Sequence, residues 1–440
     1  MTFKQAWNRR SFLSMLSAAG VGLLGAGKLR AAAAPKESGY AAWPDGNPNP
    51  KLKLTGFGSS GDVWAELGVK KYINAWGTIT LIGGSLIPPE VEAVMQMGSS
   101  HFGMLNDLER AAGKKIATML KLPPDYSALV TAGACAALLC GYGGLLAGDN
   151  RQWITQIPDT TGIPKTEVIV QKSHRYGYDQ QIRQTGIKMI EVETRDQYLS
   201  AFGPRTLSTH FLNLKNEIGQ IKIDEWLKIS HAHNVPATND AAADTPPISR
   251  LSEYCAMGYD LVMFSGGKDM RGPQCAGLLL GRQPYIDHAQ LNMSPQDSIA
   301  RGSKVGKEEI FGMIKALELF LESDQPGLLK SYSARLGVIA DAVKTMPGVE
   351  TSIEFTDEQI ANHTPNLIVS WDPAHIKWTP REVSQQLADT EPMGIHAGGA
   401  PRRRGGPPAI GFLCWQMKPG EEHIVARRLA EIFHAGQAQA

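Results

Sequence analysis

The residue of this sequence best suited to covalent chemistry is a lysine in a glycine-containing turn. Lys268 follows an apolar run at 261–264 and is preceded by Ser265, Gly266 and Gly267. A lysine amine forms Schiff bases and moves protons when its pKa is lowered. We expect the two glycines to leave room for a bulky group on that amine, and Ser265 to donate to a phosphate oxygen. The competing interpretation is an exposed lysine in a polar turn.

An aspartate occupies the matching position one strand earlier. Asp240 closes an apolar run at 235–239 and precedes three alanines. A carboxylate here is placed to face the protonated ring nitrogen of a pyridine-type cofactor, which keeps the ring electron-withdrawing. Because aspartate is also a favoured helix N-cap, a purely structural role is the alternative.

Small residues mark a third turn, where a run at 128–131 leads into a helix. Gly133, Ala134 and Cys135 stand at the start of that helix. Backbone N–H groups at a helix N-terminus attract anions, and small side chains let a phosphate approach closely. Simple close packing of strand and helix explains the same residues. The three turns together predict a site for a phosphorylated, lysine-bound cofactor.

An aromatic residue is expected to lie flat against such a cofactor ring. His174 follows the apolar segment 167–171 and is our first candidate, with Tyr176 and Tyr178 as weaker ones. A histidine after a strand is also a common structural residue.

Short apolar runs alternate with helical periodicity through most of the chain, which predicts an α/β fold. Strands that alternate with crossover helices form a mostly parallel, buried sheet covered on both faces. Ligands bind such sheets beyond the carboxyl ends of the strands, where the three turns lie. Long helical periodicity follows 306, and strands are again expected at 366–371 and 410–415. The seven expected strands of the large sheet span 128–131, 168–170, 189–192, 209–213, 235–239, 261–264 and 277–280.

The chain resembles fold-type-I pyridoxal-phosphate enzymes of the selenocysteine synthase (seryl-tRNA selenium transferase) and D-glucosaminate-6-phosphate ammonia-lyase group. The resembling stretches are 72–78, 131–138, 239–247, 264–281 and 302–310. The resemblance implies an aspartate-aminotransferase-like large domain at 71–305, followed by long helices and a small α+β domain at 306–440.

The resemblance also assigns site residues. It implies pyridoxal 5'-phosphate as cofactor, with Lys268 as its Schiff-base lysine and Asp240 at the pyridine nitrogen. His174 becomes the ring stacker, and the phosphate is bound by Gly133, Ala134, Cys135 and Ser265. Weaker candidates for binding the substrate are Asn74, Arg271 and Arg403, the last in an arginine run that also reads as a solvated loop.

The expected reaction is that of a lyase acting on an amino acid or an amino sugar acid. Lys268 removes the α-proton, a β-substituent leaves, and ammonia and an oxo acid are released. Selenium transfer, transamination and racemisation begin with the same proton abstraction and stay open. An exported, non-catalytic binding protein of the same fold would be expected to have lost Lys268 or Asp240, and both are present.

The N-terminus predicts export. Arg9 and Arg10 precede Ser-Phe-Leu, a modest apolar run and alanines up to 34, the pattern of a twin-arginine signal at 1–34. The apolar run is short for a membrane span, although an uncleaved anchor is the alternative. We therefore expect a periplasmic protein that uses the twin-arginine translocation machinery. Only an extended arm at 35–70 follows the signal, so the tRNA-binding domain of selenocysteine synthases is not expected here.

The overall composition is that of an ordinary globular protein. The 440 residues are 42% hydrophobic and 20% charged, with a net charge of +1, which does not indicate a nucleic-acid partner. Five scattered cysteines form no metal-binding or disulfide pattern. The small-molecule substrate and a second copy of the chain, in a homodimer or larger homo-oligomer, are the expected partners.

Overall fold

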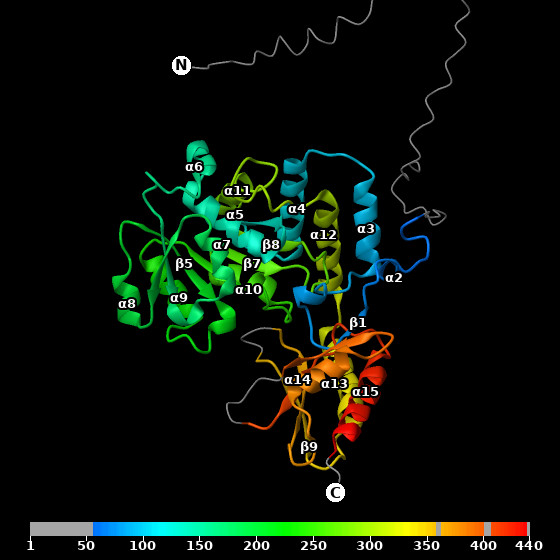
Figure 1. The fold of residues 1–440 in the computed structure, drawn as a ribbon. Helices are drawn as coiled ribbons and strands as arrows, with labels where there is room; N and C mark the ends of the chain where they lie inside the picture. Colours follow the sequence, from blue (N-terminus) through cyan, green and yellow to red (C-terminus); the bar gives the residue numbers. More distant parts are fainter. Residues whose placement is uncertain (1–55, 358–361, 400–405, 438–440) are drawn as a thin grey trace, which may run out of the picture. The chain divides into compact units, whose positions relative to one another are not determined.

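A computed structural model of the chain describes residues 56–357, 362–399 and 406–437 (Figure 1). The predicted signal at 1–34 and Arg403 lie outside these ranges, as does the arm up to 55. The described end of the arm holds a short helix, α2 (Val63–Glu66), in which no residue is buried. No helix in the described ranges combines the length and apolar character needed to cross a bilayer.

A seven-stranded sheet forms the larger part of the fold, in the order β2-β8-β7-β6-β5-β3-β4. All neighbouring pairs from β7 to β4 are parallel, whereas β8 runs antiparallel to both β2 and β7. The predicted mostly parallel sheet is therefore confirmed. Its strands are β2 (Tyr126–Thr131), β3 (Glu167–Gln171), β4 (Lys188–Val192), β5 (Thr206–Leu212), β6 (Ala237–Asp240), β7 (Leu261–Ser265) and β8 (Gly277–Arg282).

Helices connect and cover these strands, as expected for parallel neighbours that need crossovers. Helix α5 packs against β7, β8 and α11, and it is therefore buried nearly all round. This explains why its sequence has no polar face. Helices α3, α4 and α12 pack side by side (Figure 1). The helices of this part are α3 (Pro89–Ser99), α4 (Leu105–Met119), α5 (Gly133–Ala147), α6 (Arg151–Gln156), α7 (Gln180–Arg183), α8 (Arg195–Ser200), α9 (Ile223–Ala232), α10 (Arg250–Met257), α11 (Gln283–Leu291) and α12 (Lys307–Glu322).

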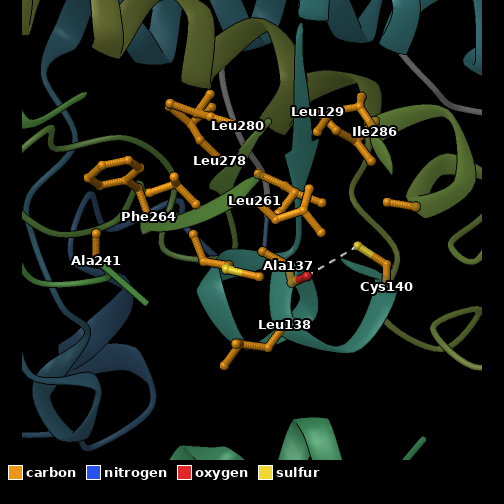
Figure 2. Close-up of a cluster of buried hydrophobic side chains, with 14 of the residues drawn as sticks. Leu129, Ala137, Leu138, Cys140, Ala241, Leu261, Phe264, Leu278, Leu280 and Ile286 are labelled. Atoms are coloured by element: carbon orange, nitrogen blue, oxygen red, sulfur yellow. Dashed lines mark hydrogen bonds between the residues drawn. The ribbon is translucent and has the colours of Figure 1, made fainter. Parts of the chain in front are cut away.

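The apolar side chains of the large sheet and its helices form one continuous core. Figure 2 shows part of it, with Leu278 and Leu280 of β8, Phe264 and Leu261 of β7, and Ala137 of α5 next to Leu261. Burial on both faces explains why these strands read as unbroken apolar runs in the sequence. The three turns of interest all leave from this rigid core.

A second apolar core belongs to the C-terminal part. Its antiparallel sheet has the order β12-β13-β10-β9, and the short strand β1 pairs in parallel with β11. A smaller C-terminal α+β part is therefore confirmed. Its elements are β1 (Tyr72–Asn74), β9 (Val349–Phe355), β10 (Pro365–Trp371), β11 (Gly394–His396), β12 (Gly398–Gly399), β13 (Ala409–Phe412), α13 (Gln325–Asp341), α14 (Pro380–Ala388) and α15 (Glu421–Gly436).

The two cores do not divide at the predicted boundary between 305 and 306. Ile310, Met313 and Leu317 of α12 are buried in the first core, although they follow the boundary. Ile73 and Ala75 precede the large sheet but are buried in the second core, because β1 pairs with β11. Side-chain packing thus assigns α12 to the large sheet and β1 to the C-terminal part.

Candidate active site

The lysine turn between β7 and β8 is closed by its own backbone. Gly266 N–H donates to Ala276 O (2.9 Å), and Gly272 N–H donates to Gly266 O (2.8 Å). A Cβ at Gly266 would lie 2.2 Å from Met313 Sδ, and one at Gly267 would lie 2.8 Å from the Gln274 Cα. The glycines are therefore required by the close approach of the turn to itself and to α12. That the glycines also leave space around the lysine amine stays a prediction.

The Lys268 side chain is largely buried at the carboxyl end of β7. Burial lowers the pKa of its amine, while the charges of Asp240, Asp244 and Cys135 act in the opposite direction. The net effect is a lowered pKa, which increases the fraction of neutral amine. A neutral amine is the form that attacks a carbonyl and accepts a proton.

Asp240 lies at the carboxyl end of β6, directly beside β7, where it pairs in register with Met263. Its side chain is 3% exposed, and burial raises the pKa of the carboxyl. The Ala242 N–H donates to Oδ1 (3.0 Å), and the Tyr176 hydroxyl donates to Oδ2. The next helix, α10, begins at Arg250. The alternative of a helix N-cap is thus not supported within this described stretch.

Ser265, one of the predicted phosphate residues, shares a row across three strands with the residue that ends β2. Thr131 at the end of β2 and Ser265 at the end of β7 both pair with Gly277 of β8. A Cβ at Gly277 would lie 2.7 Å from the carbonyl carbon of Gly133, so the backbones of β8 and the α5 turn touch. Ser265 and the N-terminus of α5 therefore lie at the same edge of the sheet.

The N-terminus of α5 fits a phosphate. Gly133, the first helical residue, has φ +83°, a backbone conformation that disfavours other residues. A Cβ added there would meet no described atom within 4 Å, so this turn has open space. The first N–H groups of a helix lack intrahelical acceptors and attract anions.

Cys135, in the α5 turn, is close enough to Asp240 and Lys268 for their charges to act on its thiol. Burial raises the pKa of its thiol, the negative charge of Asp240 raises it further, and the positive charge of Lys268 lowers it. All three predicted motifs thus converge. Lysine, carboxylate and anion-binding turn are the groups that pyridoxal phosphate requires, and these residues fit that cofactor.

His174 is placed differently from the other candidates. It is fully buried, and burial lowers the pKa of its imidazole to about 4. Its Nδ1 accepts from the Leu212 N–H (3.3 Å), and its Nε2 lies 3.2 Å from the Gln171 amide nitrogen. The weaker candidate Tyr176 is the aromatic residue that contacts Asp240. Stacking of His174 on a cofactor ring stays a prediction.

The polar atoms of two further candidates already have partners. Asn74 donates to Gly77 O (2.8 Å) and accepts from the N–H groups of Trp76 and Gly77, which makes it the organiser of a turn. The Arg271 Nε donates to Leu86 O (2.9 Å). Substrate binding by either residue stays a prediction, as it does for Arg403, which lies outside the described residues.

The structure adds residues that the sequence did not indicate. Asp244 is buried, accepts from the Tyr254 hydroxyl (2.6 Å), and has its pKa raised to about 7 by burial. The segment before α3 also holds the lysine turn, since Ser85 Oγ donates to Gly267 O (3.0 Å). The sequence could have indicated Asp244, because it is a second acidic residue four positions after Asp240. The contact of Ser85 with Gly267 could not have been predicted, because the two residues are 182 positions apart.

Comparison with curated proteins gives a relative that is similar over most of the chain. The D-glucosaminate-6-phosphate ammonia lyase of Salmonella typhimurium is 27% identical over 381 residues, covering 84% of this chain and 94% of the relative. A 5'-C-glycyluridine monooxygenase-decarboxylase of Streptomyces is 26% identical, covering 71% and 78%. The L-seryl-tRNA(Sec) selenium transferase of Rhizobium meliloti is 29% identical but covers only 38% and 40%. No protein-family model matches the chain.

Solved structures give the same result. The structure of D-glucosaminate-6-phosphate ammonia-lyase superposes with a TM-score of 0.72 at 25% identity, covering 85% of this chain and 99% of the other. A serine palmitoyltransferase of S. paucimobilis (TM-score 0.52, 13% identity, 83% and 88% covered) and a NifS-like protein (0.53, 14%, 83% and 100%) share the fold. With the site geometry, these likenesses show that the chain is a fold-type-I enzyme that uses pyridoxal phosphate and is homologous to D-glucosaminate-6-phosphate ammonia lyase and the selenium transferases.

Proposed function

We propose that this enzyme is a lyase that removes the α-proton of an amino acid or amino sugar acid, expels a β-substituent, and releases ammonia and an oxo acid. The observation that carries the proposal is the placement of the buried Lys268 and Asp240 at the ends of adjacent strands. The whole-length similarity to an ammonia lyase supports the reaction class.

Each residue of the site has a separate task in this reaction. Bound pyridoxal phosphate supplies an electron-withdrawing ring that stabilises negative charge at the substrate α-carbon. Lys268 would hold the cofactor covalently, and its Nζ, once free, would take the substrate α-proton. Its burial favours the neutral amine needed for this step. Asp240 would pair with the ring nitrogen, and the α5 turn with Ser265 would hold the phosphate.

The direct test is a substrate screen with the cofactor-loaded protein. D- and L-amino acids and amino sugar acids, including D-glucosaminate 6-phosphate, are incubated with enzyme, and ammonia and oxo acid are measured together. The proposal predicts equal amounts of the two products, and none with Lys268→Ala. Oxo acid that forms only when an amino-group acceptor is added indicates an aminotransferase. Loss of optical activity without ammonia indicates a racemase.

A transferase or a non-catalytic binding protein is the second candidate. The similarity to selenium transferases covers between 38% and 59% of this chain, whereas the similarity to the ammonia lyase covers 84%, which favours the lyase. Lys268 and Asp240 are both present, whereas a binding protein has no need of them. A protein that takes up the cofactor but releases no product from any amine in the screen would favour binding.

We also propose that the chain is exported to the periplasm by the twin-arginine route. The support is the sequence Arg9-Arg10-Ser11-Phe12-Leu13 before an apolar run. Replacing Arg9 and Arg10 by lysines should hold the folded, cofactor-bound protein in the cytoplasm. Unchanged recovery from the periplasmic fraction would contradict the assignment.

We further propose that the enzyme is a homo-oligomer. Phe102 and Met104, in the segment between α3 and α4, are exposed in the single chain by 103% and 73%. Large apolar side chains gathered on one region commonly mark a protein interface. Light scattering at micromolar concentration should give at least twice the chain mass. Replacing Phe102 and Met104 by glutamate should lower that mass, and a fully active monomer would contradict the proposal.

A further inference from the structure

A chain of polar side chains leads from Asp240 into the interior of the large sheet. The Tyr176 hydroxyl donates to Asp240 Oδ2 and lies 3.4 Å from His210 Nε2. On the other side of the imidazole, the Tyr142 hydroxyl lies 2.9 Å from Nδ1 and 2.6 Å from Thr238 Oγ1. Tyr142 comes from α5, His210 from β5 and Thr238 from β6. Three elements and the segment after β3 thus contribute to one network that ends at the carboxylate.

If Asp240 is ionised and His210 is neutral, the chemistry of these groups sets the direction of the donors. An ionised carboxylate only accepts, so the Tyr176 proton points to Asp240 and its oxygen accepts from His210 Nε2–H. A neutral imidazole has one N–H, so Nδ1 must accept, and the Tyr142 hydroxyl is placed to donate to it. The Thr238 hydroxyl has a single proton and lies 2.6 Å from the Tyr142 oxygen and 3.1 Å from the Thr209 carbonyl, which is its other possible acceptor. The protons of Tyr142, His210 and Tyr176 then all point toward Asp240.

This direction requires that His210 stays neutral. His210 is fully buried, and burial lowers the pKa of its imidazole to about 3, with His174 acting in the same direction and Asp179 against it. The imidazole also lies parallel to the Tyr176 ring, with an angle of 2° between the planes and 6.1 Å between the centroids. Each donor strengthens the next one in such a chain.

Stability alone does not explain the network. Buried polar groups replaced as a set by apolar ones of similar shape leave stability nearly unchanged or increase it. Asp240 is 3% exposed, so its ionised form needs donors inside the protein. Removing the Tyr176 hydroxyl would leave Oδ2 without the donor that the structure provides.

We propose that Tyr176, His210 and Tyr142 are positioning residues that hold Asp240 ionised and oriented toward the cofactor ring nitrogen. The inference rests on pyridoxal phosphate as the cofactor and on the assignment of Asp240 to its ring nitrogen. Tyr176 acts directly on the carboxylate. His210 acts through Tyr176, and Tyr142 acts through His210. Thr238 completes the chain at its inner end.

The test uses ¹⁵N-labelled pyridoxal phosphate in the reconstituted enzyme, because the ¹⁵N shift reports protonation of the ring nitrogen without turnover. The wild type should show a protonated nitrogen. Tyr176→Phe and His210→Asn should shift the signal toward the neutral form, and should lower kcat about tenfold with KM changed less than twofold, as for loss of one hydrogen bond to a charged group.

Tyr198→Phe is the matched control. Tyr198 is also buried, but its hydroxyl donates to Trp226 O (3.0 Å), away from Asp240. It should leave the ¹⁵N shift unchanged. The proposal would be overturned if Tyr176→Phe had the same ¹⁵N shift as the wild type, or if Tyr198→Phe changed the ¹⁵N shift as much as Tyr176→Phe does. His210→Asn decides the matter if Tyr176→Phe does not fold. A wild-type enzyme that binds cofactor with a neutral ring nitrogen contradicts instead the assignment of Asp240.

Discussion

Replacing Asp240 by asparagine separates the charge of this side chain from its shape. The amide oxygen can still accept from the Ala242 N–H, which lies 3.0 Å from Oδ1, while the negative charge beside Lys268 is lost. The turn after β6 is therefore expected to keep its conformation. What changes is the partner of the protonated ring nitrogen.

The magnitude follows from that lost partner. A hydrogen bond between charged groups contributes about 1.5–3 kcal/mol, and each 1.36 kcal/mol of barrier is a factor of ten in rate. We expect kcat to fall about 10- to 150-fold in Asp240→Asn, with cofactor loading changed much less. The assay is steady-state ammonia release, with loading measured by visible absorbance.

Stability should change in the opposite direction. Burial raises the pKa of Asp240, although Tyr176, Ala242 and Lys268 oppose it, so the folded chain holds this proton more tightly than the unfolded chain. That contribution is fully present below the unfolded pKa and is lost as pH rises through the folded value. Cofactor-free Asp240→Asn should thus melt no lower than wild type at pH 7, with the difference shrinking toward pH 4. Normal turnover, or marked destabilisation at pH 7, would refute the reasoning.

Two further changes test the surroundings of the site. Burial raises the pKa of Glu109 on α4 from 4.5 to about 7, and each pH unit corresponds to about 1.4 kcal/mol. Glu109→Gln should therefore be more stable than the wild type by about 3 kcal/mol at pH 8 but not at pH 4, with kcat unchanged. Equal stability of variant and wild type at both pH values in urea unfolding would contradict this. Gly277→Ala places a Cβ 2.7 Å from the backbone of both Gly133 and Phe264, so we expect a loss of about 1–3 kcal/mol and weaker cofactor binding in fluorescence titration, whereas Gly337→Ala, which has open space in α13, should retain both.

The sequence predicted the large sheet well because its strands are buried on both faces. All seven expected runs became strands, and Lys268 and Asp240 lie on neighbouring strand ends as the order of the runs implied. Strand β9 was missed because most of its residues are exposed, so it has no continuous apolar signal. Strands β1 and β11 were missed because each has three residues and they pair across more than 300 positions.

The site was predictable where one turn carries the signal and not where distant segments meet. Within the lysine turn, and likewise within the α5 turn, the residues that matter lie a few positions apart, so their types could be interpreted together. His210 lies in the middle of β5 and looks like any strand residue, although its ring nitrogens connect Tyr142 and Tyr176. No local pattern distinguishes it from His174, whose nitrogens contact Gln171 and Leu212 instead.

The measurement that tests the central claim most directly is chemical trapping of the cofactor. The protein is loaded with pyridoxal phosphate, reduced with borohydride, digested and analysed by mass spectrometry. We predict a single modified peptide with the reduced cofactor on Lys268, and no stable adduct in Lys268→Ala. An adduct on another lysine, or none in a protein that retains its fold, would contradict the account.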